Sequence, residues 1–280
     1  MRHPRIFLTG GTGQVGGELR SALGPLGIVC APNRKELDLE DLKSLRLIVQ
    51  NFKPDLIVNP AAYTAVDKAE SEPELAQAIN VEVPRVLAEE ANKLGIPVIH
   101  YSTDYVFDGS KCEPYTEEDI TNPINVYGRT KLEGEDAIQD AHDQYLILRT
   151  SWVYSPERGE NFYRTMLELF KQREEVQVVD DQFGAPTSTL FLAEKTFNIL
   201  SQVKSKEEGE NRWGTYHLTQ EDNMSWYEFA RIILEEAKKQ PCDLKIKSVQ
   251  PISSNQLNLI AKRPRNSQLN CSKIFENFLL

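Results

Sequence analysis

The sequence predicts an α/β protein with a doubly wound, Rossmann-type parallel sheet and a smaller C-terminal domain. Over the first 150 residues, apolar segments and amphipathic segments alternate in the order β-α-β-α-β-α-β, which predicts a parallel sheet with helices on both faces. A glycine-rich turn follows the first apolar segment, and a Tyr-x-x-x-Lys pair follows a later one. Because the alternation then becomes irregular, we assign residues 1–150 to the first domain and 151–280 mainly to the second, with later segments returning to the first.

The composition is that of a soluble globular protein. The 280 residues are 40% hydrophobic and 26% charged, which is ordinary for one large or two modest domains. The formal net charge of −10 argues against nucleic acid or an anionic membrane surface as a partner. No apolar run is long enough to span a bilayer, and residues 1–4 lead into a strand without a signal peptide. We therefore expect neither a membrane partner nor a nucleic-acid partner.

Cysteine and histidine usage bears on compartment and on metals. Cysteines at positions 30, 112, 242 and 271 have no paired spacing, and the four histidines have no metal-ligand spacing. A reduced, cytoplasmic protein without a structural metal is the expectation.

The first strand and the turn after it indicate a dinucleotide site. Arg5–Thr9 is apolar, and Gly10, Gly13 and Gly16 follow in a G-x-x-G-x-x-G pattern before an amphipathic helix. Glycines there allow a tight turn in which backbone amides approach a pyrophosphate at the helix N-terminus. A plain βα connection is the alternative. The expected cofactor contacts in this turn are Gly10, Thr12, Gly13, Gln14 and Val15.

The segment after the second strand bears on the choice of cofactor. Residues 28–32 form that strand, and Arg34 follows it, where NAD-specific sites usually have a carboxylate. A guanidinium suits a 2′-phosphate, so NADPH is the expected cofactor, with use of NADH left open. Arg34 as an exposed turn residue is the alternative. Asp38 and Leu39 are expected near the adenine edge.

Two further strands end in residues suited to a ligand. Residues 55–59 run into small residues that let the backbone pack close to a cofactor, although ordinary small-residue packing would look the same. Residues 96–103 read as a buried strand ending in two hydroxyls, where open α/β sheets bind their ligands. Between them, 65–73 reads as a polar loop before a long helix that ends near Gly95. The expected cofactor contacts from these segments are Ala61, Ala62, Tyr63 and Ser102.

Tyr127 and Lys131 form the Tyr-x-x-x-Lys pair. On a helix, this spacing puts both side chains on one face, one turn apart. A fixed ammonium favours the phenolate and brings the phenol pKa down from about 10 towards the range of efficient proton transfer. The alternative is a surface helix with a snorkelling lysine.

The rest of the chain is less regular. Tyr145–Arg149 is a strand, whereas 151–154 and 180–187 read as loops with polar and aromatic groups near a ligand. Residues 204–212 read as a charged surface linker, and 216–219 as a strand. A capping box, Ser-x-x-Glu, opens a helix at Ser225. That helix is expected to bury Phe229, Ile232 and Ile233.

Taken together, these segments resemble the dTDP-4-dehydrorhamnose reductase family of the extended short-chain dehydrogenase/reductase superfamily. The resemblance covers nearly the whole chain. The glycine motif and Tyr-x-x-x-Lys are shared across the superfamily, whereas 65–70 and the Thr-Ser-Trp segment are more specific. The segments that carry the resemblance are 9–16, 65–70, 102–107, 125–131, 149–154 and 263–267.

The resemblance implies a reaction and roles for named residues. Hydride from the nicotinamide would reduce C4 of dTDP-4-keto-6-deoxy-L-mannose to give dTDP-L-rhamnose. Tyr127 would protonate the oxygen, Lys131 would lower the Tyr127 pKa and bond the nicotinamide ribose, and Thr103 would polarise the keto group. The implied substrate contacts are Val66, Asp104, Tyr105 and Trp152 at the sugar, and Arg263 at the diphosphate. For Trp152 the alternative is core packing, and for Arg263 a surface salt bridge.

Some positions depart from the family pattern. Pro60 stands where alanine is usual, and Leu280 ends the chain short of the usual final helix. Some relatives dimerise through a glutamate-bound magnesium. Glu18 fits one ligand position, but Leu190 occupies another, so we expect no metal and a monomer or a weak homodimer.

Two rival functions stay open at this point. A nucleotide-sugar epimerase shares the fold and both motifs but retains an NAD-type cofactor permanently. The regulatory subunit of methionine adenosyltransferase resembles this family, and a protein of that kind would bind NADP and a partner enzyme without turnover.

Overall fold

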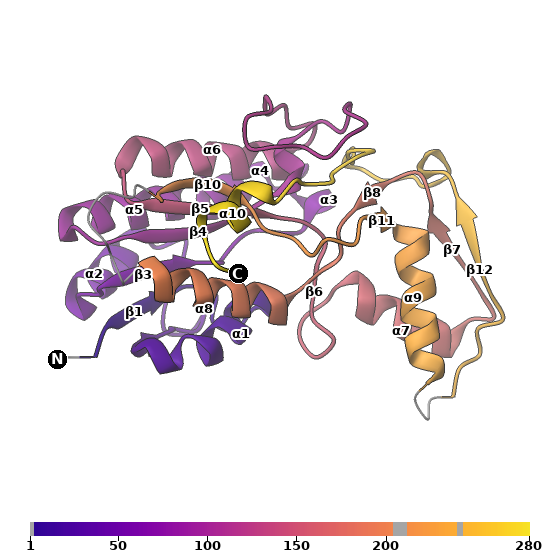
Figure 1. The fold of residues 1–280 in the computed structure, drawn as a ribbon, viewed down its shortest axis with the longest axis horizontal. Coiled ribbons are helices and arrows are strands. Elements are labelled where there is room, and N and C mark those ends of the chain that lie inside the picture. Colours follow the sequence, from indigo (N-terminus) through magenta and orange to yellow (C-terminus); the bar gives the residue numbers. More distant parts are fainter. Residues whose placement is uncertain (1–2, 204–211, 240–242) are drawn as a thin grey trace.

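The computed structural model describes residues 3–203, 212–239 and 243–280 (Figure 1). Its main feature within these residues is a sheet of six strands in the order β10-β5-β4-β3-β1-β2. All neighbouring strands run parallel. The strands are β1 (Arg5–Leu8), β2 (Ile28–Cys30), β3 (Leu56–Asn59), β4 (Val98–Thr103), β5 (Tyr145–Thr150) and β10 (Gly214–His217).

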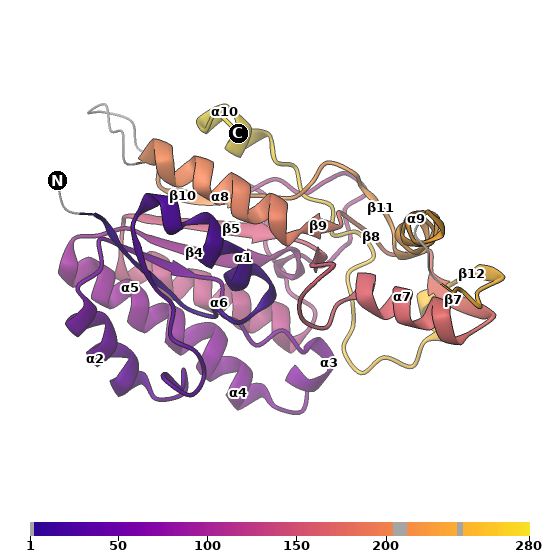
Figure 2. The ribbon, with the colours of Figure 1, turned by 90° about the horizontal axis from the view of Figure 1, so that it is seen from below.

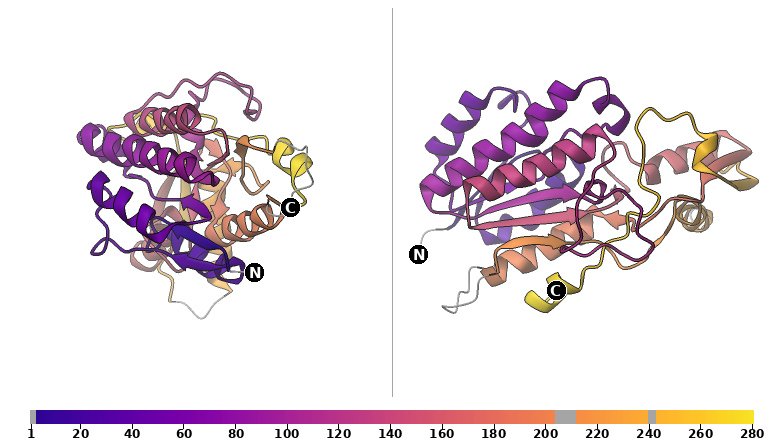
Figure 3. Two further views of the ribbon diagram at one scale, coloured as in Figure 1. Left: turned by 90° about the vertical axis from the view of Figure 1, so that its left-hand side faces the viewer. Right: turned by 90° about the horizontal axis from the view of Figure 1, so that it is seen from above.

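Helices cover both faces of this sheet (Figures 2 and 3). On one face, α1 (Gln14–Ala22) packs against α8 (Thr189–Val203). On the other lie α2 (Leu42–Phe52), α5 (Val83–Leu94) and α6 (Val126–Ala141). Side chains in β1 alternate between these layers, since Ile6 and Leu8 belong to the α1 side and Phe7 to the α5 side. The predicted doubly wound α/β fold is confirmed.

The strand order places the ligand-binding edge. From β1 the sheet continues to β2 on one side and to β3 on the other, so the direction of winding reverses there. Ligands of open α/β sheets bind outside the carboxyl ends of the strands at such a reversal. Gly10, Pro60 and Asp104 follow β1, β3 and β4 directly or after one residue, so the predicted site segments meet at this edge.

A smaller unit lies at one end of the molecule (Figure 1). It combines α7 (Phe162–Gln172) and α9 (Trp226–Lys238) with the parallel strands β7 (Glu175–Val179) and β12 (Ser248–Ile252). Phe170, Phe229 and Ile233 are in its core. The elements after residue 150 are divided between the two units, because α8 and β10 lie with the larger one, as does α10 (Ser272–Asn277), which packs against β10.

The segment 65–73 is not wholly a loop, as the sequence had suggested. It contains a helical turn, α3 (Val66–Ala69), and the following helix runs as α4 (Pro73–Gln77), a π-helical turn η2 (Ala78–Glu82) and then α5. Pro84 has no N–H to donate to the carbonyl of Asn80, which favours a local departure from α-helical bonding.

Short strands replace two of the predicted loops. Residues 151–154 contain β6 (Val153–Tyr154), and 180–187 contain β8 (Phe183–Gly184) and the first residue of β9 (Thr187–Ser188). β6 pairs with β9, and β8 pairs with β11 (Met224–Ser225). Strands of two residues are too short to show alternation in a sequence.

Other predictions have mixed outcomes. The capping box at Ser225 is present, and Phe229 and Ile233 are buried, but Ile232 is 42% exposed, so its predicted burial is wrong. Of the predicted linker, 204–211 lies outside the described residues. None of the described helices has both the length and the apolar character that a bilayer span requires. The remaining short helices are 3-10 turns at Gly24–Leu26, Asp104–Val106 and Ser254–Gln256.

Candidate active site

The glycine-rich turn forms a close-packed backbone cradle after β1. Gly10 has a φ of +57°, and a Cβ on Gly16 would lie 2.1 Å from the Gly10 carbonyl oxygen. A Cβ on Gly10 would lie 3.1 Å from the Cα of Ala61, at the end of β3. Thr12 and Gly13 are exposed, and α1 begins at Gln14 without a side-chain cap. The backbone at this helix N-terminus is therefore presented as a pyrophosphate site requires.

The other predicted cofactor residues lie around this cradle. Arg34 is exposed in the turn after β2, and Asp38 is exposed with its carboxylate accepting the amide of Glu40. Leu39 packs on the core of the α5 layer. Tyr63, two residues after Ala61, donates its backbone N–H to Asn80 of η2 at 2.8 Å. Val15 packs on the α1 core, and Ala62 is half-buried beside Ala61.

Tyr127 and Lys131 lie one turn apart at the start of α6, as their spacing predicts. Asn125 caps this helix by accepting the amide of Gly128 at 2.7 Å. Lys131 is only 1% exposed, so the alternative of a snorkelling surface lysine is wrong. Its ammonium donates to the carbonyl oxygen of Tyr101 at 2.6 Å and contacts His100 Nε2 at 2.9 Å.

These contacts change the expected electrostatics of the pair. Burial raises the pKa of Tyr127 to about 12, and a hydrogen bond with the Thr103 hydroxyl acts in the opposite direction. Burial lowers the pKa of Lys131 to about 7. The Lys131 Nζ is bonded to β4 and not to the phenol. The expected lowering of the Tyr127 pKa by Lys131 is thus not seen in the protein alone.

Thr103 and its two neighbours form a buried polar corner at the end of β4. The Thr103 hydroxyl donates to Asp104 Oδ1 at 2.9 Å and accepts the amide of Tyr105 at 3.2 Å. Burial raises the pKa of Asp104 to about 7. The Tyr105 ring meets the Tyr127 ring edge-on, with centroids 5.8 Å apart. Ser102 Oγ is among the buried atoms of the described residues that have no hydrogen-bond partner, which is compatible with its predicted role as a cofactor contact.

The segment 65–70 connects the site to distant parts of the chain. Asp67 of α3 pairs with Arg263 at 2.6 Å and accepts the amide of Ala261 at 3.0 Å. Glu70 accepts the amide of Val126, the first residue of α6, at 2.9 Å. Val66 begins α3 and is half-buried. Arg263 thus forms the salt bridge that was the alternative to diphosphate binding, and its diphosphate role stays a prediction.

Trp152 is held in an unusual conformation. Its φ is +47°, which is rare for a residue with a side chain, and its ring stacks on Trp226 with centroids 3.5 Å apart and planes at 6°. Gly184 packs so closely that a Cβ there would lie 2.5 Å from Trp152 Cε2. Sequence reasoning missed Trp226, although the capping box had placed it at a helix start.

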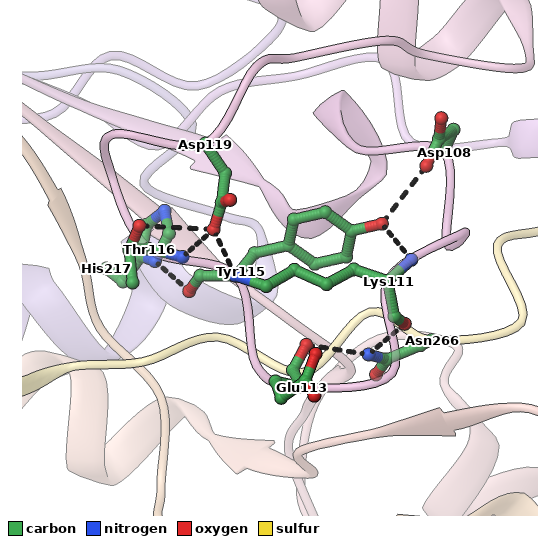
Figure 4. A network of polar contacts seen from close by, with 8 residues as sticks. All are labelled: Asp108, Lys111, Glu113, Tyr115, Thr116, Asp119, His217 and Asn266. Atoms are coloured by element: carbon green, nitrogen blue, oxygen red, sulfur yellow. Dashed lines mark hydrogen bonds and ion pairs between the residues drawn. The ribbon is translucent and has the colours of Figure 1, made fainter.

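A polar network anchors the loop that follows β4 (Figure 4). Tyr115 stacks on Phe107 and donates its hydroxyl to Asp108 at 3.0 Å. Asn266 donates to the carbonyl oxygens of Lys111 and Glu113. The loop is therefore fastened to the C-terminal segment that also carries Arg263.

His100 and Asn59 are the buried polar residues that sequence reasoning overlooked. Both lie inside predicted strands, His100 in the middle of β4 and Asn59 at the carboxyl end of β3, and both are at most 1% exposed. A polar residue within an apolar strand was the available signal.

The predicted absence of a metal concerns Glu18 and Leu190. Glu18 pairs with Arg158 at 3.1 Å, and Leu190 is exposed on α8. In the described part of the chain, no three His, Cys, Asp or Glu side chains are grouped to hold a metal ion.

The chain resembles known proteins over nearly its whole length. The model of the RmlD substrate binding domain family matches residues 4–280. The chain belongs to this family. It is 45% identical over 279 residues to the dTDP-4-dehydrorhamnose reductase of Escherichia coli K12, covering 98% of this chain and 92% of that protein.

Solved structures of the same family share the fold. The dTDP-4-dehydrorhamnose reductase of Clostridium acetobutylicum matches with a TM-score of 0.88 at 36% identity, over 97% of this chain and 92% of that one. The enzyme of the same name from Bacillus anthracis, in complex with NADP, also matches with a TM-score of 0.88, at 35% identity, over 99% of this chain and 93% of that one. The resemblance inferred from the motifs is confirmed.

Proposed function

We propose that this chain reduces the C4 keto group of dTDP-4-keto-6-deoxy-L-mannose with NADPH, giving dTDP-L-rhamnose. The observation that supports the proposal is the hydrogen bond between Tyr127 and Thr103, with Lys131 one turn further along α6, in a chain 45% identical to a reductase of this name. The cradle fits a dinucleotide because α1 begins without a side-chain cap behind the exposed Thr12 and Gly13, which leaves the helix N-terminus open to a pyrophosphate. The Bacillus anthracis relative in complex with NADP supports NADPH, with use of NADH left open.

The residues of the chain supply position and a proton. Bound NADPH would supply the hydride to C4 of the sugar. The Thr103 hydroxyl and the Tyr127 phenol would both donate to the keto oxygen, and Tyr127 would pass its proton to that oxygen as the C4–H bond forms. Lys131 would stabilise the phenolate that remains, until a proton from solvent restores the phenol. The cofactor contacts would be those named above at the strand ends, from Gly10 to Ser102.

The substrate contacts come from both units. Val66, Asp104, Tyr105 and Trp152 would line the sugar site, and Arg263 would bind the diphosphate. The smaller unit would then be the substrate-binding domain, since Trp152 stacks on Trp226 at the start of α9. The relatives named dTDP-4-dehydrorhamnose reductase favour a reductase over an epimerase or a regulatory subunit.

Oxidation of NADPH with the dTDP-keto sugar tests the proposal. We expect turnover by the wild type and a loss of ~10²–10⁴-fold in Tyr127→Phe, with NADPH binding retained, because only the proton donor is removed. Tyr145→Phe, which changes a tyrosine on β5, is the control. Conversion of the sugar without net oxidation of a cofactor that stays bound would instead indicate an epimerase. Binding of the cofactor without any conversion of the sugar would indicate a regulatory subunit.

We also infer a monomer or a weak homodimer that needs no metal. Leu190 offers no oxygen ligand, and the carboxylate of Glu18 is already paired with Arg158. Light scattering with and without EDTA tests this, and a magnesium-dependent dimer would overturn it. Location in the cytoplasm stays a prediction from cysteine usage.

A further inference from the structure

Four buried polar side chains, Lys131 and three others, form a continuous series of hydrogen bonds beneath the site. Lys131 Nζ lies 2.9 Å from His100 Nε2, and His100 Nδ1 lies 3.0 Å from Asn59 Nδ2. Asn59 Oδ1 in turn lies 2.5 Å from the hydroxyl oxygen of Thr9. These hydrogen bonds thus cross from α6 through the middle of β4 and the end of β3 to Thr9, the residue before the glycine turn.

Because these four side chains are buried, each depends on its neighbours for hydrogen bonds. Each of the four side chains is at most 1% exposed, so water cannot substitute for a lost partner. Unmade hydrogen bonds are expensive in such surroundings. A change of proton position at one of these side chains therefore changes the hydrogen bonds of the next.

One arrangement of protons suits a neutral Lys131. The Thr9 oxygen accepts the amide of Ala61, which leaves its own hydrogen to donate to Asn59 Oδ1. Asn59 Nδ2 then donates to His100 Nδ1, and a neutral imidazole carries its proton on Nε2. That N–H points at Lys131 Nζ, which accepts it only as an amine.

The opposite arrangement suits a charged Lys131. If the Asn59 amide is turned over, its oxygen accepts a proton from His100 Nδ1, and His100 Nε2 becomes an acceptor. Asn59 Nδ2 then donates to the Thr9 oxygen, and Thr9 no longer donates to Asn59. The Lys131 ammonium then donates to His100 Nε2 and to the Tyr101 carbonyl oxygen. Of its three N–H groups, one is left to face the site.

We propose that His100 is a positioning residue that holds Lys131 in both of its charge states, with its tautomer set by Asn59. His100 touches neither the expected substrate nor the expected cofactor and acts only through Lys131. In the proposed reaction, Lys131 would pass a proton to the Tyr127 phenolate and regain one from solvent, and His100 would hold its side chain in place through both steps.

The neighbouring charges are compatible with this role. Burial, reinforced by the Lys131 charge, holds the pKa of His100 well below its usual range and outweighs a hydrogen bond with the Asn59 backbone that acts in the opposite direction, so the ring is neutral. Glu135 of α6 favours the charged form of Lys131, but its carboxylate is itself bonded to Arg149 of β5 at 2.7 Å. On the site side, Asp104 and Tyr105 are the titratable groups near Tyr127.

Substitutions that favour either the neutral or the charged form of Lys131 test the proposal. His100→Leu removes the acceptor that stabilises the charged form of Lys131. The alkaline limb of the kcat–pH profile, which we assign to Lys131, should therefore move down by about one pH unit, as expected for one hydrogen bond to a charged group. His100→Gln keeps an acceptor and should recover most of this shift. Asn59→Asp places a carboxylate behind His100 Nδ1 and should move the limb upwards. His142→Gln, at the far end of α6, is the matched control.

A merely structural role would lower stability without this ordered change of sign. Alkaline limbs that coincide in all of these variants, or an Asn59→Asp limb that moves downwards, would overturn the proposal. If His100→Leu does not fold, the Gln and Asp variants still decide the matter.

The activity readout rests on the proposed function, so a second measurement is independent of it. Nitrogen NMR of isotope-labelled histidine reports the tautomer of each of the four histidines. We expect the His100 signals to change with pH in the wild type and to lose that change in Lys131→Met. Unchanged His100 signals in Lys131→Met would overturn the inference. A wild type that is inactive would count against the proposed function alone.

Discussion

Arg263 and Asp67 form an ion pair with Nη2 and Oδ2 2.6 Å apart, although 196 positions separate them in the sequence. The pair ties the C-terminal segment to α3, and the Arg263 guanidinium holds the pKa of the Asp67 carboxyl below its usual range. A guanidinium has more donors than one carboxylate uses, so the same group can also bind a diphosphate.

We expect Arg263→Ala to raise KM for the dTDP-sugar about tenfold or more while leaving KM for NADPH nearly unchanged. The reason is the loss of a charge-assisted contact, worth roughly 1.5–3 kcal/mol. Steady-state kinetics measures both constants. Arg46→Ala, which breaks a pair with Glu90 on another face, is the control. Equal rises in the two constants would indicate that Arg263 only supports the fold.

Arg34 offers a test of cofactor choice. It is exposed in the turn after β2, where a 2′-phosphate is expected. Arg34→Ala should weaken NADPH on the order of tenfold and NADH much less. Titration of each cofactor gives the two dissociation constants, and Lys35→Ala, at the adjacent exposed cation, is the control. A similar loss for both cofactors would remove Arg34 from phosphate recognition.

Gly184 offers a test of the stacked tryptophans. A methyl group at this position would collide with Trp152, so Gly184→Ala should displace the indole from Trp226. Overpacking of this kind costs about 1–3 kcal/mol in the free energy of unfolding, and KM for the sugar should rise as well. Gly24→Ala has open space and should change stability by less than about 0.5 kcal/mol. Denaturant unfolding compares them, and an unaffected Gly184→Ala would show that Trp152 can adapt.

Asp104 predicts a specific dependence of stability on pH. Burial raises its pKa from 3.8 to about 7, so between these values the folded state holds a proton that the unfolded state has lost. Its contribution is fully present below about pH 4 and is lost as the pH rises through about 7, on the order of a few kcal/mol. Relative to Asp104→Asn, the wild type should therefore lose stability over that range.

Urea unfolding at a series of pH values measures this difference. Asp108→Asn is an informative control because backbone and side-chain hydrogen bonds with Ser110 lower the pKa of Asp108. Asp108 should stabilise the wild type above its unfolded pKa and lose that effect as the pH falls. A flat difference between the wild type and Asp104→Asn would mean that Asp104 is ionised in the folded protein.

The sequence by itself determined the layered fold and the main chemistry of the site. Strand patterns, the glycine turn after β1 and the spacing of Tyr127 and Lys131 are local features, and local features are legible in a sequence because they depend on neighbours a few positions apart. Since parallel strands bring their carboxyl ends to one edge, the location of Thr103 and the glycine turn at the same edge of the sheet also followed. Two-residue strands such as β6 and β8 could not be predicted from the sequence, because they are too short to show a period.

Only the tertiary structure decided the partners of the charged side chains. The pairing of Arg263 with Asp67, the stacking of Trp152 on Trp226 and the contact of Lys131 with His100 all join segments far apart in the sequence. Burial determined the protonation of the Tyr127–Lys131 pair. It raises the pKa of Tyr127 and lowers that of Lys131, against the expectation from their spacing alone. A four-residue spacing places two groups on one helix face, but the surrounding core determines which partners they bond and how strongly each holds its proton.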